Sequence, residues 1–224
     1  MTFDREVLNR LYSTTSQPGA IFSYNLQTSR FVNQDTSHPC LGTLTYYKGS
    51  MYGTNGEEVF AAKLPHRQRV ARLVQSSISG VLPDGKGNFY GLTAGTGAGP
   101  NGSPRPGYIF KFALPTNGYV IPTTLHHFIG TDGGWARLAP LFMDANGNVY
   151  GTTPRGGGGY TTQETGNGVV FRLTPEGAYQ LLYTFTGGAD GGSPYAGVVS
   201  YPAGGMIGAA SDGGDGVGVL YSIQ

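Results

Sequence analysis

The chain has 224 residues, including 39 glycines and 14 prolines, and its 14 basic and 13 acidic residues give a formal net charge of +1. Charged residues make up only 12 %, about half of the usual share, whereas aromatic residues also reach 12 %. This balance argues against a disordered chain and against a broad nucleic-acid surface. The chain has no apolar run of roughly 18 residues, which argues against a membrane helix. Its glycines have no three-residue period, which excludes collagen.

The N-terminal segment, residues 1–13, is charged and has no apolar stretch of the kind found in a secretory signal. Cys40 is the only cysteine, so an intrachain disulfide is impossible. Both features predict a reduced, cytoplasmic protein. A secreted form whose signal has been removed stays open as an alternative.

A short motif of the Tyr-Gly-Thr type recurs five times along the chain. Its copies occupy residues 11–15, 51–55, 89–93, 149–153 and 206–210. Each copy is followed by a second motif that ends in an aromatic residue, at residues 19–22, 57–60, 107–110, 168–171 and 218–221. These segments are short, rich in β-branched and aromatic residues, and bounded by turn-forming residues, which is typical of strands joined by hairpins.

Each repeat therefore predicts four antiparallel strands, A to D, which is the pattern of a β-propeller blade. The approximate repeats are 8–36, 37–76, 77–131, 132–190 and 191–224, within a single domain 1–224. We predict an all-β, five-bladed β-propeller of four-stranded antiparallel blades. The last repeat ends on its C strand, so the segment from Phe3 to Leu8 either completes that blade, which brings the chain termini together, or forms the innermost strand of the first blade.

These motifs resemble the Gloeo-Verruco type β-strand repeat family. The fourth repeat carries the likeness most fully, from Tyr150 through Phe185 and then over residues 190–198. Other repeats depart from it, since Ser13 replaces the motif glycine and Ile207 replaces the motif tyrosine. The resemblance implies a propeller fold but no common chemistry, because a fold does not determine a function.

The connections between strands alternate between the two ends of a blade, and their lengths differ. The A–B and C–D connections are tight turns, two of which contain Asp84 and Asp144, where aspartate stabilises local backbone. The B–C loops are long in three repeats, at residues 94–106, 154–167 and 211–217. Long loops gathered on one face usually carry function, so we expect a pocket on this face and not beside the two aspartates.

Three residues depart from the small residues or proline that the family-like pattern has in the D–A segments. They are Trp135, Arg137 and His38. A tryptophan and an arginine two residues apart form a flat, cationic wall that suits an aromatic or anionic ligand. In the alternative, Trp135 plugs the channel, Arg137 pairs with Asp132, and His38 has no role.

The hypothetical site is assigned as follows. Arg137, His38 and Tyr195 are the expected catalytic residues, with Arg137 holding an oxygen and His38 moving a proton. Trp135, Cys40, Arg155 and Tyr160 are the expected substrate-binding residues, although Cys40 also fits a small buried thiol. We expect no cofactor and no metal, because the chain has no motif for either.

Three functions remain open. The first is a cofactor-independent cyclase or lyase acting on a small aromatic or polyene-like ligand, because the chain resembles natural-product tailoring proteins that include hetero-Diels–Alder cyclases. The second is a lectin-like carbohydrate-binding propeller similar to the tachylectin type. The third is a scaffold that binds another protein. We expect a monomer with no nucleic-acid or membrane partner.

Overall fold

Strands and hairpin turns account for nearly all of the regular structure in the computed structural model. It describes residues 2–3, 10–15, 20–25, 30–35, 43–63, 66–77, 79–98, 104–136, 139–161, 165–201 and 204–224. Within these residues the one helical element is a 3₁₀ turn, η2 (Gly214–Gly216). The prediction of an all-β chain is confirmed.

The described strands form five antiparallel sheets in chain order, together with one short ribbon. The first sheet has the order β1 (Thr2–Phe3), β2 (Arg10–Thr15), β3 (Ala20–Asn25), β4 (Arg30–Asp35). The second has the order β5 (Thr45–Tyr47), β6 (Ser50–Thr54), β7 (Gly56–Lys63), β8 (His66–Ser77). The third has the order β9 (Val81–Pro83), β10 (Asn88–Leu92), β13 (Tyr108–Ala113), β14 (Thr123–His127).

The fourth sheet has the order β15 (Phe142–Met143), β16 (Val149–Thr153), β17 (Val169–Leu173), β18 (Tyr179–Thr184). The fifth has three strands, β19 (Val198–Ser200), β20 (Met206–Ala210), β21 (Val219–Ile223). The ribbon pairs β11 (Thr96–Ala98) with β12 (Pro104–Arg105) inside the long loop of the third sheet. Four-stranded antiparallel sheets are therefore confirmed as the repeating unit.

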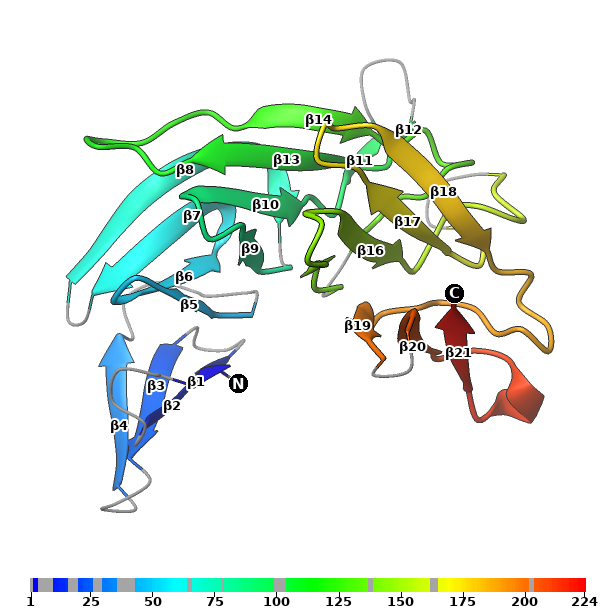
Figure 1. Ribbon diagram of the computed structural model, residues 1–224, viewed down its shortest axis with the longest axis horizontal. Coiled ribbons are helices and arrows are strands. Elements are labelled where there is room, and N and C mark those ends of the chain that lie inside the picture. The colour runs from blue at the N-terminus through cyan, green and yellow to red at the C-terminus, as the bar shows by residue number, and fades with distance from the viewer. Residues whose placement is uncertain are drawn as a thin grey trace.

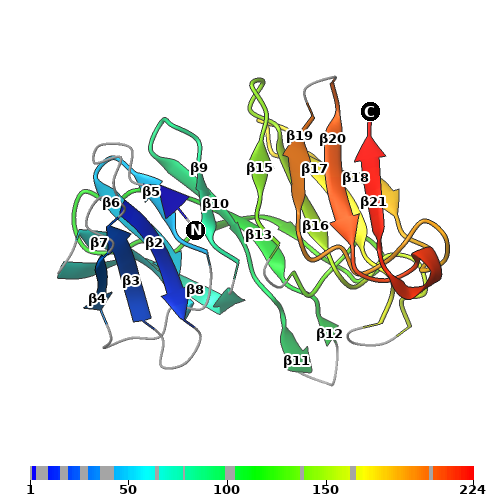
Figure 2. The same cartoon turned by 90° about the horizontal axis from the view of Figure 1, so that it is seen from below.

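The five sheets follow one another along an arc (Figures 1 and 2). The first and the last sheet lie at opposite ends of this arc, so the expectation that the chain termini meet in one blade is wrong. Thr2 and Phe3 instead pair with Tyr12 and Leu11 of β2, and they form the innermost strand of the first sheet. A partner a few residues away costs less loop-closure entropy than one at the far end of the chain. Five blades in a closed ring stay a prediction.

The recurring motif is explained by contacts across each ladder. The motif glycine of one strand pairs with the aromatic residue of the next, as Gly91 pairs with Phe110 and Gly151 with Phe171. A Cβ atom on Gly91 would lie 2.3 Å from Cζ of Phe110, so a larger residue does not fit there. The aromatic ring of the second motif therefore requires the glycine of the first.

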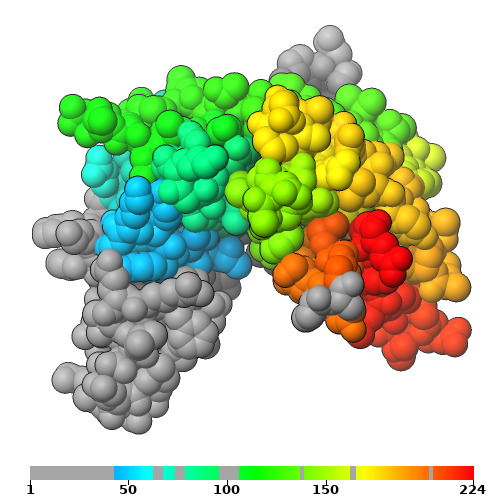
Figure 3. Space-filling view, viewed as in Figure 1, coloured from blue at the N-terminus to red at the C-terminus, as the bar shows by residue number. Residues whose placement is uncertain are grey.

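The apolar core lies between successive sheets and not within one large centre. Ile109 of β13 is fully buried against residues of the fourth sheet, and Val170 of β17 is fully buried against residues of the fifth. In the space-filling view the third and fourth sheets meet at the middle of the arc (Figure 3). Each sheet therefore depends on its neighbour for most of its burial, which is the packing of a propeller.

Candidate functional site

Two cavities open at the end of the sheets where the tight turns lie. The first has a volume of about 360 Å³ and lies between the third and fourth sheets, beside the turns of Asp84 and Asp144. The second has a volume of about 500 Å³ and lies between the fourth and fifth sheets. Neither of these two cavities lies on the long-loop face, where we expected the pocket. The grooves between sheets open here because short turns leave the inter-sheet space uncovered.

The carboxylate of Asp84 is hydrogen-bonded within the turn that joins β9 to β10. Its Oδ1 accepts hydrogen bonds from the backbone N–H of Lys86 at 2.8 Å and of Asn88 at 3.0 Å, and its Oδ2 accepts one from Nδ2 of Asn88 at 2.6 Å. Burial acts to raise the pKa of Asp84, but these hydrogen bonds, together with the charge of Lys111, outweigh it and hold the pKa below its usual value. The carboxylate stabilises the backbone, as its position in a turn predicts.

Asp144 holds the equivalent turn between β15 and β16 in the same way. Its Oδ1 accepts from the N–H of Asn146 and Asn148, each at 2.9 Å, and its Oδ2 accepts from Nδ2 of Asn148 at 2.8 Å and from the Tyr150 hydroxyl at 3.1 Å. Burial acts to raise the pKa of Asp144 too, and the hydrogen bonds again lower it overall. Neither aspartate is free to act as an acid or a base.

The repeats place a cation opposite the motif tyrosine in two neighbouring sheets. Tyr90 pairs with Lys111 in the third sheet, and Tyr150 pairs with Arg172 in the fourth. In the fourth sheet both groups are engaged within the protein, because Nε of Arg172 donates to Oε1 of Gln180 at 2.8 Å and Tyr150 donates to Asp144. The fourth sheet therefore shows how the tyrosine and the cation are bonded when both have partners, and the third sheet can be compared with it.

In the third sheet the Lys111 amine and the Tyr90 hydroxyl form no such hydrogen bonds within the described residues. The Nζ of Lys111 lies 5.0 Å from the centroid of the Tyr90 ring. Among the described residues, the Lys111 amine, the Tyr90 hydroxyl and the Lys86 amine form no hydrogen bond or ion pair, although the charge of Lys111 acts on Asp84. Two ammonium groups that are not hydrogen-bonded to the described protein therefore line one cavity.

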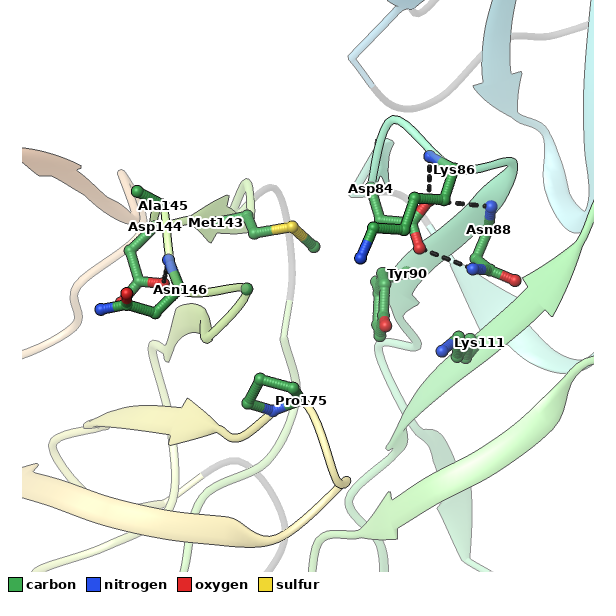
Figure 4. Close-up of a pocket in the computed structure, with 11 residues that line it drawn as sticks. Asp84, Lys86, Asn88, Tyr90, Lys111, Met143, Asp144, Ala145, Asn146 and Pro175 are labelled. Carbon is green, nitrogen blue, oxygen red and sulfur yellow. Dashed lines mark hydrogen bonds between the residues drawn. The ribbon is translucent and has the colours of Figure 1, made fainter.

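The first cavity, called pocket 1 below, has two unlike walls (Figure 4). Tyr90 and Lys111 lie on the third-sheet side, whereas Met143 and the turn of Asp144 face them from the fourth sheet, with Pro175 between. This arrangement joins positive charge to flat and apolar surfaces. A volume near 360 Å³ lies at the small end of the range typical of small-molecule sites.

The second cavity, called pocket 2 below, is more apolar. Phe142, Leu182, Met206 and Ile223 line it, and its one cation, Arg172, is held by Gln180. Pockets 1 and 2 share the residues of one turn, Met143, Asp144 and Ala145. The two cavities are therefore neighbours on the same end of the molecule.

The structure brings together three of the residues that the sequence suggested for the site. Trp135 and Tyr160 have ring centroids 6.0 Å apart, and Gly134, next to Trp135, forms a bridge with Arg155. Trp135 is only 3 % exposed, however, so its ring faces protein. The Nη1 of Arg155 donates to Oγ of Ser193 at 2.8 Å.

The remaining suggested residues are Tyr195, Arg137, His38 and Cys40. Tyr195 is 39 % exposed on the surface of its loop. Arg137, His38 and Cys40 lie outside the described residues. The proposed partner of Arg137, Asp132, accepts hydrogen bonds from the N–H of Ile129 at 2.8 Å and pairs with His126.

Reasoning from the sequence missed Tyr90, Lys86 and Lys111. Tyr90 belongs to the repeated motif, where it looks structural, and Lys86 sits in a turn where a lysine is unremarkable. A signal was present for Lys111, because it lies between the alternating aromatic residues Phe110 and Phe112 of β13 and aligns with Arg172 of β17. Its pairing with Tyr90 depends on the register between β10 and β13. The loop between these strands differs in length from repeat to repeat, so the sequence does not show this register.

Several solved structures are similar in fold to this chain at low sequence identity. A nidogen/laminin complex matches with a TM-score of 0.60 and 16 % identity, over 90 % of this chain and 68 % of that chain. A protein of unknown function from Bacteroides thetaiotaomicron matches with a TM-score of 0.57 and 11 % identity, over 89 % of this chain and 49 % of that chain. A luciferin-regenerating enzyme matches with a TM-score of 0.54 and 13 % identity, over 93 % of this chain and 67 % of that chain.

These likenesses are to β-propeller-like proteins, and they show the fold alone. The chain spans about half the length of the Bacteroides protein. No family model matches the chain, so the specific repeat family stays a prediction. No curated protein matches it either. Among the described residues, no helix is long and apolar enough to cross a membrane.

Proposed function

We propose that this protein is a small-molecule-binding β-propeller whose pocket 1 holds an organic anion with a flat apolar part. One observation carries the proposal, namely that the Lys111 amine lies 5.0 Å from the Tyr90 ring centroid at the wall of the cavity and forms no ion pair with a described carboxylate. Its charge acts on Asp84, but this is the smallest of the causes that lower the pKa of that carboxyl. The equivalent Arg172 is held by Gln180. The fourth sheet thus provides a hydrogen-bond partner for its cation within the fold, and the third sheet provides no such partner for Lys111 among the described residues.

The bonding of the charged groups, and not their net charge, favours an anion over a neutral ligand, because two carboxylates and two ammonium groups line the pocket. The carboxylates of Asp84 and Asp144 accept hydrogen bonds within their own turns, and although the charge of Lys111 acts on Asp84, neither carboxylate forms an ion pair with Lys86 or Lys111 among the described residues. A ligand carboxylate can accept charge-assisted hydrogen bonds from both amines. The Tyr90 ring, Met143 and Pro175 supply the surfaces that a flat apolar group contacts.

Binding is the part of the hypothesis that the pocket supports directly. The flat surfaces of Tyr90 and Pro175 support a small aromatic or polyene-like ligand of the kind expected from the sequence, in a pocket beside the tight turns and not beside the long loops. Cyclase or lyase chemistry on that ligand rests on the resemblance to natural-product tailoring proteins. A lectin has equivalent sites in its repeats. Pockets 1 and 2 are not equivalent, because they differ in whether their cations are hydrogen-bonded and in the apolar residues that line them.

Isothermal titration with cinnamate, and with cinnamamide as its neutral counterpart, tests the proposal. We expect wild type to bind cinnamate and to bind cinnamamide at least about tenfold more weakly, because a hydrogen bond to a charged group contributes about 1.5–3 kcal/mol. Lys111→Met is expected to weaken cinnamate binding by about tenfold to a hundredfold for the same reason.

Lys48→Met is the matched control. Lys48 also lies over a tyrosine ring, at 5.2 Å from the Tyr47 centroid, but it does not line pocket 1. Its removal is expected to leave cinnamate binding unchanged, and circular dichroism shows whether each variant keeps its strands. Equal loss in both lysine variants, or equal affinity for cinnamate and cinnamamide, contradicts the proposal.

A further inference from the structure

Pocket 2 has apolar walls that no other part of the described chain fills. Phe142 of β15, Leu182 of β18, Met206 of β20 and Ile223 of β21 come from two different sheets and surround about 500 Å³. Met206 is buried, and the other three are half-buried. Such a surface is stabilised when apolar material replaces water beside it.

The two charged side chains that line pocket 2 are already engaged in hydrogen bonds. Both Nε and Nη2 of Arg172 donate to Oε1 of Gln180. Asp144 is saturated by its turn and by Tyr150. These contacts hold both charged side chains against protein partners, and most of the remaining wall is apolar, so the pocket suits an apolar group.

Pockets 1 and 2 adjoin along a single turn, and their chemistry is complementary. Met143, Asp144 and Ala145 line both cavities. The ammonium groups of Lys86 and Lys111 lie on one side of this turn, and the apolar walls lie on the other. A ligand that crosses the turn meets a cationic subsite first and an apolar subsite second.

We propose that the ligand is an amphiphilic carboxylate, whose head binds Lys86 and Lys111 in pocket 1 and whose aliphatic tail passes over the Met143–Ala145 turn into pocket 2. This inference rests on the proposed function, because it takes the anion site of pocket 1 as given. It adds the class of the ligand and a second subsite that determines chain-length specificity.

Titration with butanoate, hexanoate, octanoate and decanoate, all below their aggregation concentrations, tests the inference. In wild type the affinity is expected to rise with length by up to about fourfold for each buried methylene. Ser200→Phe fills pocket 2 from its exposed edge, because Ser200 lines the cavity on β19. This variant is expected to lose the rise with length while it still binds cinnamate.

Ser222→Phe is the matched control, since Ser222 is an exposed serine on the same sheet that does not line pocket 2. It is expected to keep the rise with chain length. Lys111→Met is expected to weaken all four carboxylates by a similar factor.

The outcomes separate the two proposals. If cinnamate binds in a Lys111-dependent manner but affinity does not rise with chain length, or Ser200→Phe leaves that rise intact, the amphiphile inference is wrong and the proposed function stands. If decanoate binds equally well to Lys111→Met, pocket 2 is an independent apolar site and the amphiphile inference is wrong. If neither cinnamate nor the aliphatic carboxylates bind, the proposed function itself is wrong.

Discussion

At the scale of single residues, the repeats show which side chains fit their positions and which do not. Tyr221 of β21 stands where the third and fourth sheets have Phe110 and Phe171, both fully buried. The Tyr221 hydroxyl is buried and has no hydrogen-bond partner, and burial raises the pKa of this residue above its ordinary value of 10.0. A buried hydroxyl without a partner costs stability.

Tyr221→Phe is therefore expected to raise the free energy of unfolding by about 1–2 kcal/mol, because it removes the unpaired hydroxyl and keeps the ring. Urea denaturation measures the change. Tyr150→Phe is the control with the opposite sign, since the Tyr150 hydroxyl donates to Asp144 and its loss is expected to cost about 1 kcal/mol. If Tyr221→Phe is instead less stable than wild type, the interpretation that the Tyr221 hydroxyl is buried without a partner is wrong.

At the scale of the strands, the third and fourth sheets are tied together by a polar cluster at their outer edge. His126 of β14 stacks on Tyr179 of β18, with ring centroids 3.8 Å apart and ring planes 6° from parallel. Nε2 of His126 lies 2.8 Å from Oδ2 of Asp132, and the Tyr179 hydroxyl donates to the backbone oxygen of Asp132 at 2.6 Å. Burial, and then the charge of Asp132, raise the pKa of Tyr179 well above 10.0.

This cluster predicts a loss of stability in alkali. Because the pKa of Tyr179 is raised in the folded state, its contribution is complete below the ordinary value of 10.0 and is lost as pH rises above it, where the unfolded chain releases the proton first. Urea denaturation from about pH 8 to about pH 11 is expected to show a steeper fall for wild type than for Tyr179→Phe. Tyr179→Phe is also expected to be less stable near neutral pH, by about 1 kcal/mol, because it lacks the bond to Asp132. Parallel curves for the two proteins contradict the assignment.

At the scale of the whole molecule, the arc leaves one inter-sheet face uncovered. Leu220 of β21 aligns with Val170 of β17 and Ile109 of β13, which the following sheet buries completely. Leu220 itself is 78 % exposed, because no described sheet follows the fifth. The first sheet lies at the other end of the arc (Figure 1). The exposure of Leu220 therefore reports directly on whether the ring is open.

Leu220→Ala is expected to change the free energy of unfolding by less than about 0.5 kcal/mol, as surface substitutions usually do. Val170→Ala is expected to cost about 2 kcal/mol, because it removes buried methyl groups and leaves a cavity between two sheets. Thermal or urea unfolding of both variants makes the comparison. A similar cost at the two positions means that another sheet covers Leu220 in solution.

The sequence by itself determined the strands, the hairpins and the propeller-like repeat. These features depend on contacts between neighbouring strands, such as the close fit of Gly91 to Phe110, and a local contact leaves a pattern that recurs along the chain. The structural role of Asp84 and Asp144 was predictable for the same reason, since an aspartate in a tight turn bonds to backbone a few residues away.

Only the tertiary structure decided where the cavities lie, which cations are free, and how the sheets are placed around the arc. Lys111 and Arg172 look alike in the sequence, and they differ because Gln180 lies opposite Arg172 on the next strand, whereas Thr123 lies opposite Lys111. Trp135 looked exposed in its loop, and the packing of that loop against Tyr160 buried it. A cavity between two sheets is the space that their contacts leave unfilled, so it depends on residues distant in the chain whose relative positions no local pattern encodes.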